Sequence, residues 1–198
     1  LLSRRQRQMC IRDRIIWESA CRKIREWIDK GIEPVPISVN ISREYIHTFD
    51  VVGEMLHLVN KYDIPIKLLE LEITETTDSE GVSDVVQKMK DAGFTMLMDD
   101  FGSGYSSLNM LQKTQFDVLK IDRGFLSEFM ESSRGRKIIS HTISMSRDIG
   151  LDIIAEGVET PEQASFLSDC GCDSAQGFYY SKPITQEEFD KMLVEVNK

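Results

Sequence analysis

Six short apolar runs, separated by amphipathic stretches, constrain the fold of this chain more than any other feature. The stretches 15–30, 80–91, 134–149 and 161–169 carry apolar residues at helical spacing, whereas the runs have the length and composition of buried strands. The runs lie at 36–41, 68–74, 95–100, 117–121, 152–156 and 174–178. Strands that alternate with helices form a parallel α/β sheet, which is either a barrel or an open doubly wound sheet.

Acidic side chains recur where these runs end. They are Glu72, Glu75, Asp99, Asp100, Glu156 and Glu159. Parallel strands deliver their C-terminal ends to one side of the sheet, so we expect a dense cluster of carboxylates there. Chemistry-bearing residues at nearly every strand end favour a (β/α)8 TIM-type barrel, because an open sheet concentrates them at one switch point. A complete barrel has eight strands and typically ~250 residues, so we expect this barrel to be incomplete, with about six strands.

A carboxylate cluster of this kind predicts a divalent cation. Carboxylates cannot crowd into a cleft unless some protonate or a cation lies among them, and hard oxygen ligands suit Mg²⁺ or Mn²⁺. Asp99 and Asp100 are adjacent, but a turn of the backbone at the strand end would let them reach different ions. Simpler alternatives stay open: these two acids could cap a helix at 105–112, Lys120 could pair with Asp122, and Asn40 could be a turn residue.

The composition argues against several other classes of protein. The chain has 33 acidic and 24 basic residues and a net charge of −9, so a broad basic face for a nucleic-acid polymer is not expected. An apolar stretch of ~20 residues is missing, so no membrane span is expected in this segment. The cysteines form no zinc-like pair of motifs, and we interpret them as reduced cytosolic thiols. They are Cys10, Cys21, Cys170 and Cys172.

The first 14 residues, LLSRRQRQMCIRDR, differ from the rest. They carry five arginines and no apolar period, and they join abruptly to the well-patterned helix at 15–30. We interpret residues 1–14 as foreign, resembling translated sequencing-adapter text, with a disordered basic arm as the alternative. The domain itself is expected at 15–198.

Six motifs occur in an order and at intervals that identify a family. They are SVNIS at 38–42, ELEITE at 70–75, DDFGSGYSSL at 99–108, DVLKID at 117–122, IIAEGVET at 153–160 and CDSAQGFYYSKP at 172–183. Together they closely resemble the EAL domain, a bacterial phosphodiesterase family that acts on cyclic di-GMP. The resemblance covers roughly residues 15–195. It implies a (β/α) barrel that holds two Mg²⁺ or Mn²⁺ ions and opens the cyclic dinucleotide to linear pGpG.

The resemblance also implies a role for each matching residue. The metal ligands would be Asn40, Glu72, Asp99 and Asp100, with Asp100 also serving in catalysis. Lys120 matches the active-site lysine, Glu156 the glutamate that assists water activation, and Gln176 the glutamine near the substrate. The supporting residues would be Glu75, which anchors the loop after Asp100, and Glu159.

The loop Gly102-Ser103-Gly104 follows the adjacent aspartates. A Gly-x-Gly segment can cradle phosphate or serve as an ordinary flexible turn. We favour a mobile loop that couples the metal site to a subunit interface, as the resemblance implies, with Ser103 where the family more often has Thr. Tyr179 and Tyr180, which follow Gln176, could stack on guanine or form a packed aromatic pair.

The Glu-Ala-Leu signature that names the family is absent, and with it a metal-binding glutamate. Because every remaining motif is intact, we expect the parent protein to be an active phosphodiesterase. Because this glutamate is absent, we expect this truncated chain to be inactive or impaired. The alternatives are a non-catalytic cyclic di-GMP receptor and, from another class, a metal-dependent barrel lyase or aldolase.

The resemblance also indicates the surroundings of the domain. It implies a homodimer in the bacterial cytosol, with a sensor or GGDEF domain upstream. The full-length protein could be anchored to the membrane through N-terminal domains that this chain does not contain.

Overall fold

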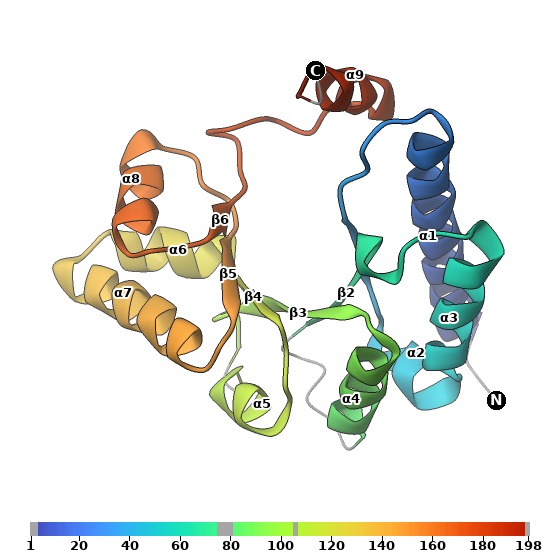
Figure 1. Cartoon of the computed structure of the whole chain (residues 1–198). Coiled ribbons are helices and arrows are strands. Elements are labelled where there is room, and N and C mark those ends of the chain that lie inside the picture. The colour runs from blue at the N-terminus through green and yellow to red at the C-terminus, as the bar shows by residue number, and fades with distance from the viewer. Residues whose placement is uncertain (1–3, 75–80, 105–106, 197–198) are drawn as a thin grey trace. The chain divides into compact units, whose positions relative to one another are not determined.

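The computed structural model describes residues 4–74, 81–104 and 107–196 (Figure 1). In chain order the elements are α1 (Arg4–Asp29), β1 (Ile37–Asn40), α2 (Arg43–Thr48), α3 (Val51–Tyr62), the 3₁₀ helix η1 (Ile66–Leu68), β2 (Leu69–Thr74), α4 (Val82–Ala92), β3 (Thr95–Phe101), α5 (Ser107–Lys113), β4 (Val118–Ile121), α6 (Arg123–Met130), α7 (Ser133–Asp148), β5 (Asp152–Ala155), α8 (Pro161–Asp169), β6 (Ser174–Ala175) and α9 (Gln186–Val196). Helices therefore alternate with strands along most of the described chain.

The six predicted strands are confirmed, and they form one sheet in the order β1-β2-β3-β4-β5-β6. The pairs β1–β2, β3–β4, β4–β5 and β5–β6 are parallel. A parallel sheet whose spatial order follows the chain is the topology of a (β/α) barrel rather than of an open sheet, in which the order reverses at a switch point. The described residues thus supply six of the eight strands of a TIM-type barrel.

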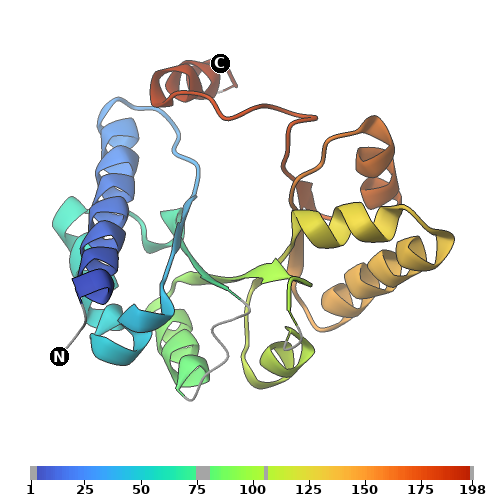
Figure 2. The ribbon, with the colours of Figure 1, turned by 180° about the vertical axis from the view of Figure 1, so that it is seen from behind.

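The chain divides into two compact units. Of the described residues, the first unit comprises 4–73, 81–96 and 186–196, and the second comprises Thr74 and those of 97–185. In the first unit α1 and α3 lie side by side (Figures 1 and 2). The helix α9 is held to α1 through Asp190, which accepts hydrogen bonds from Lys23 Nζ at 2.5 Å and Trp27 Nε1 at 2.8 Å.

The predicted start of the first helix at residue 15 is wrong, because α1 already begins at Arg4. Its buried face includes Cys10, Asp13 and Trp17, which follow one another at intervals of three and four residues. Aspartate is mostly found at protein surfaces, so the buried Asp13 interrupts the apolar pattern when only the sequence is read. The assignment of residues 1–14 to a foreign segment or basic arm stays a prediction.

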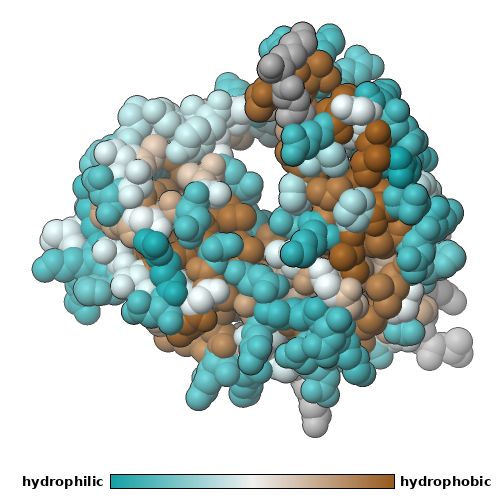
Figure 3. All heavy atoms as spheres, in the orientation of Figure 1, coloured by the Kyte–Doolittle hydropathy of each residue, from teal (hydrophilic) through white to brown (hydrophobic). Residues whose placement is uncertain are grey.

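In the second unit, α6, α7 and α8 pack against β4 and β5. Their shared core consists of Ile121, Leu126, Met130, Ile139, Ile143, Ile153, Ala155, Val158 and Leu167. Polar side chains at the helix starts bind the free backbone N–H groups there: Ser132 caps α7, and Thr160 with Gln163 forms a capping box on α8. On the face that Figure 3 shows, hydrophilic side chains make up much of the surface, and hydrophobic ones are visible between them.

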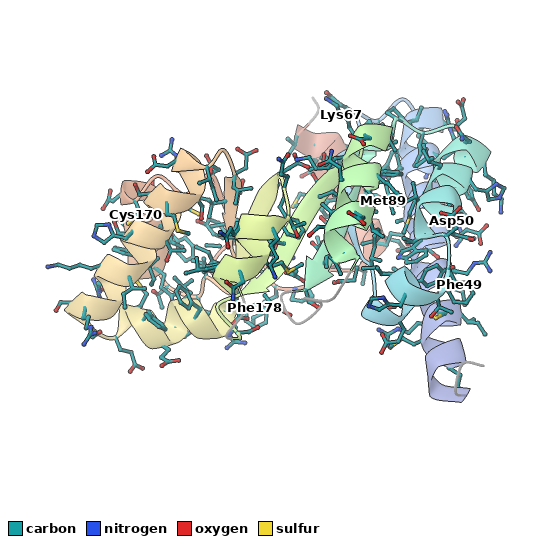
Figure 4. All side chains as sticks on the ribbon, turned by 90° about the horizontal axis from the view of Figure 1, so that it is seen from below. Phe49, Asp50, Lys67, Met89, Cys170 and Phe178 are labelled. Carbon is teal, nitrogen blue, oxygen red and sulfur yellow. The ribbon has the colours of Figure 1, made fainter. Side chains whose placement is uncertain are left out.

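All four cysteines are free thiols. Burial raises the pKa of Cys21 to about 11, and it also raises the pKa of Cys172. Cys170 is the C-cap of α8, where Figure 4 labels it. Since the thiolate is the reactive form, Cys21 and Cys172 are suited to packing rather than to nucleophilic chemistry. Among the helices of the described chain, none has the length and hydrophobicity needed to cross a membrane.

Candidate active site

A β-bulge near the end of β3 separates the two adjacent aspartates. Met98 pairs with Leu119 and Phe101 with Ile121, so three steps on β3 face two on β4. The bulge contains Asp100 with a φ of 58°, in the left-handed region that aspartate tolerates better than most residues. The backbone N–H of Ser103 then donates to the carbonyl oxygen of Asp100 at 3.1 Å. The predicted turn of the backbone at these acids is therefore present.

Lys120 joins two of the predicted site acids. Its Nζ lies 2.9 Å from Asp99 Oδ1 and 2.7 Å from Glu156 Oε1. Gln176 extends the network, because its Nε2 donates to the same Glu156 oxygen at 2.7 Å. Lys120 is only 7% exposed and Asp99 8%, so this ion pair is largely removed from water. The ends of β3, β4, β5 and β6 thus bring together four of the residues that the motifs single out.

The alternative in which Lys120 pairs with Asp122 is not what the structure contains. Asp122 is the N-cap of α6, and its Oδ1 accepts hydrogen bonds from the N–H groups of Gly124 at 2.7 Å and Phe125 at 3.2 Å. This cap starts α6 immediately after β4. Because the Asp122 carboxylate binds the start of the helix, Lys120 pairs with Asp99 and Glu156 instead.

In the first unit, Asn40 and Glu72 are neighbours on paired strands. Asn40 is the last residue of β1 and lies opposite Glu72 in the ladder, and its Nδ2 donates to Glu72 Oε2 at 3.3 Å. The carbonyl oxygen of Asn40 accepts a hydrogen bond from Trp17 Nε1 at 2.9 Å. Asn40 is thus a strand residue rather than a turn residue. Trp17, which the motifs did not indicate, holds the backbone of Asn40 through this bond.

The remaining predicted residues have different surroundings. Glu159 lies in the loop after β5, where its Oε1 is 2.7 Å from Arg123 Nη2. Gly102, Ser103 and Gly104 form a partly exposed turn after β3. Glu75 lies outside the described residues.

The aromatic residues after Gln176 are solvent-exposed. The rings of Tyr179 and Tyr180 contact each other edge to face with centroids 5.0 Å apart, so they form an aromatic pair. Both remain exposed, as does Phe178, which Figure 4 labels. Stacking of these rings on guanine stays a prediction.

The donor set suits a hard divalent cation. Asp99 Oδ1 is buried and accepts no hydrogen bond from the described residues, its contact with Lys120 being an ion pair. Burial raises the pKa of Asp100, and the negative charges of Asp99, Asp122 and Glu156 raise it further, while Lys120 opposes them. A nearby cation would stabilise the charged form of such a carboxylate. Within 4–74, 81–104 and 107–196, however, no three His, Cys, Asp or Glu side chains are grouped as a metal site.

The raised pKa of Asp100 predicts how stability depends on pH without metal. The folded protein holds this proton to a higher pH than the unfolded chain, so stability falls as pH rises from the ordinary value of 3.8 through the folded pKa. Asp100→Asn has no such proton to lose. In EDTA at neutral pH it should therefore melt at a higher temperature than wild type, and the difference should shrink toward about pH 3.

Asp100→Ala separates the effect of the lost charge from the effect of the left-handed backbone conformation in this experiment. It removes the same charge but lacks the side-chain amide that lets asparagine tolerate the left-handed conformation, so it should melt below Asp100→Asn. Equal slopes of melting temperature against pH for wild type and Asp100→Asn would contradict the electrostatic explanation.

Comparison with known proteins agrees with the motifs and the sheet. The model of the EAL domain family matches residues 5–183. This chain belongs to the EAL domain family. It is 34% identical over 183 residues to the signaling protein YkoW of Bacillus subtilis, covering 91% of this chain and 23% of YkoW.

Two further comparisons concern MucR. The chain is 35% identical over 176 residues to the bifunctional diguanylate cyclase/cyclic di-GMP phosphodiesterase MucR of Pseudomonas aeruginosa, covering 87% of this chain and 26% of MucR. A solved structure of the PaMucR phosphodiesterase in complex with c-di-GMP superposes with a TM-score of 0.84 at 33% identity, covering 92% of this chain and 75% of that one. The chain thus has the fold of solved EAL domains and spans about a quarter of the length of these curated relatives.

Proposed function

We propose that this chain is the phosphodiesterase module of a bacterial signalling protein and that the site hydrolyses cyclic di-GMP to linear pGpG with divalent metal. The observation that carries the proposal is the network in which the buried Lys120 lies between Asp99 and Glu156, while the exposed Gln176 donates a hydrogen bond to Glu156. Membership of the EAL family and the likeness to MucR support the choice of substrate.

Each side chain of the network has a distinct task in this proposal. Glu156 accepts the proton of the attacking water, and its bonds from Lys120 and Gln176 fix the carboxylate in one orientation. Lys120 places a compact positive charge where negative charge grows on the phosphodiester. Gln176 also lies at the rim of the site, where its amide can contact the substrate.

The metal would be Mg²⁺ or Mn²⁺, held as two ions by Asn40, Glu72, Asp99 and Asp100. All four offer oxygen atoms, which these hard cations prefer. When bound, such ions supply Lewis acidity that offsets the charge of the phosphodiester. Glu75 would anchor the loop after Asp100, and Glu159 would support Glu156.

We also propose that the printed chain by itself turns over slowly or not at all. Its sequence contains no Glu-Ala-Leu tripeptide, whose glutamate would complete the metal site. We place the parent protein in the bacterial cytosol or at the membrane through other domains, with a sensor or GGDEF domain upstream.

A homodimer is proposed to form at an apolar groove in the second unit. The groove has a volume of about 800 Å³ and is lined by residues of the loop after β3 and of α5, α6 and α7. Leu108 and Ile138 lie in it and are exposed, at 61% and 39%. Gly102 also lines it and packs closely on Phe125, so the groove is continuous with the loop that follows Asp100. A second copy that covers the groove would therefore contact the loop beside the site.

Leu108→Asp should weaken this dimer while leaving the fold intact, because an exposed side chain is changed and a charge is placed in the apolar groove. Sedimentation at several protein concentrations measures the effect, with an expected rise of at least about tenfold in the dimer dissociation constant. Asn109→Asp, at a neighbouring polar position of the same groove, is the milder control. A dimer equally stable in Leu108→Asp would refute this interface.

The function is tested by separating binding from cleavage. Calorimetry with cyclic di-GMP in EDTA measures affinity, and chromatography after addition of Mn²⁺ measures pGpG under single-turnover conditions with the protein in excess. A second protein, in which the Glu-Ala-Leu segment of MucR replaces residues 1–14, restores the missing ligand. We expect pGpG from this second protein at a rate at least about 100-fold above that of the printed chain. Affinity without product in both proteins would instead establish a receptor.

A further inference from the structure

Arg123 occupies a position that its own helix does not favour. It is the first residue of α6, directly after the Asp122 cap and three residues after Lys120. The N-terminus of a helix carries a partial positive charge, so a cation there weakens the helix rather than stabilising it. The stability of α6 therefore does not explain why an arginine occupies this position.

The contacts of Arg123 are with the turn that follows Glu156. Gly157 has a φ of 65°, and the space that a Cβ would need there is filled by Cβ, Cγ and Cδ of Arg123. The guanidinium continues past this glycine to Glu159, whose Oε1 lies 2.7 Å from Nη2. The aliphatic stem of Arg123 thus packs on Gly157, and its guanidinium binds Glu159 in the same turn.

The other sides of the same turn are held by neighbouring strands. The N–H of Glu156 donates to the carbonyl oxygen of Ile121 at 3.0 Å, and the N–H of Val158 donates to that of Gln176 at 3.0 Å. Val158 is fully buried. Arg123 closes the remaining side at Gly157, between the two residues that these bonds fix.

From this arrangement we infer that Arg123 is a positioning residue: its side chain holds the turn at Gly157 and Glu159 so that Glu156 stays between Lys120 and Gln176. The inference rests on the proposed function, because it matters for chemistry only if Glu156 takes part in hydrolysis. Both partners of the Arg123–Glu159 pair are well exposed, at 61% and 42%, and such a pair alone contributes little. Packing of the arginine stem on Gly157 carries most of the effect.

Four variants test the inference in the full chain. Arg123→Met keeps a stem and removes the charge, whereas Arg123→Ala removes both. Gly157→Ala inserts a methyl group into the space of the stem, and the double variant Arg123→Ala with Gly157→Ala vacates that space again. Arg136→Met is the matched control, because it breaks another exposed Arg–Glu pair of the same unit, at 2.6 Å to Glu162.

Two readouts distinguish positioning from a general loss of structure. The exchange rate of the Gln176 side-chain amide reports the bond to Glu156 without any turnover. Single-turnover pGpG formation, measured with the same substitutions in the protein that carries the Glu-Ala-Leu segment of MucR, reports hydrolysis. Gly157→Ala and Arg123→Ala should accelerate amide exchange and lower the hydrolysis rate by roughly tenfold, with the concentration of cyclic di-GMP at half-maximal rate unchanged. Arg123→Met should have a smaller effect, because its stem remains.

The double variant gives the sharpest result. It should recover part of the amide protection that Gly157→Ala loses, although alanine with a positive φ keeps some strain. Unchanged amide exchange in both Arg123→Ala and Gly157→Ala, as in Arg136→Met, would overturn the inference. If the protein that carries the Glu-Ala-Leu segment of MucR yields no pGpG while the amide responds as expected, the proposed function fails and the placement of Glu156 by Arg123 stands.

Discussion

Replacing Lys120 with methionine is expected to lower the free energy of unfolding of the metal-free protein by about 3 kcal/mol. Methionine has a similar length, so the packing volume is nearly kept. The loss arises because Asp99, which is 8% exposed, would remain buried without its cation, and Glu156 would lose its ion pair at 2.7 Å. Urea denaturation in EDTA measures the change.

Two further variants make this result specific. Lys137→Met removes an exposed lysine of α7 and should change the free energy of unfolding by less than about 0.5 kcal/mol. Asp99→Asn added to Lys120→Met removes the unpaired charge and should recover part of the loss, as coupled partners do. If Lys120→Met unfolds at the same urea concentration as Lys137→Met, the buried ion pair does not stabilise the fold.

Glu156→Gln is expected to lower the rate of pGpG formation by about 10² to 10⁴-fold, with little change in the concentration of cyclic di-GMP that gives half the maximal rate. Glutamine keeps the shape of glutamate but cannot take up a proton from water. Single-turnover experiments with saturating Mn²⁺ and excess protein measure the effect in the protein that carries the Glu-Ala-Leu segment of MucR.

The control for this second variant is Glu162→Gln, at an exposed glutamate in the first turn of α8. It removes the same charge and should leave the rate unchanged. A rate for Glu156→Gln within about threefold of this control would show that Glu156 does not act as a base.

The sequence predicted the sheet well because buried parallel strands carry a signal that needs no tertiary context. Runs such as 117–121 and 152–156 are apolar on both faces, so each is recognisable by itself. The extent of α1 was not predicted, since Cys10 and Asp13 are buried only through contacts with the rest of the unit. Helix α2 was not named in advance, because its six residues are too few to show a helical period.

For the candidate site, the sequence predicted which side chains stand at the strand ends but not how they pair. The partners of Lys120 could not be read from the chain, since Asp122 is two residues away whereas Asp99 and Glu156 meet it only through the sheet. The bulge at Asp100 is likewise a property of strand register. Arg123 and Trp17 were missed because their contacts, with Glu159 and Asn40, are also long-range. The position of Arg123 directly after the DVLKID motif was the signal that could have indicated it.

The rate of pGpG formation as a function of Mn²⁺ concentration, compared between wild type and Asp100→Asn, tests the metal-dependent site most directly. Both proteins should carry the Glu-Ala-Leu segment of MucR, so that a missing ligand does not limit the rate. We predict a saturable rise with Mn²⁺ in wild type, no hydrolysis in EDTA, and a loss of at least about 100-fold in Asp100→Asn, although that variant should be the more stable protein without metal. Hydrolysis that persists in EDTA, or that is equally fast in Asp100→Asn, would contradict it.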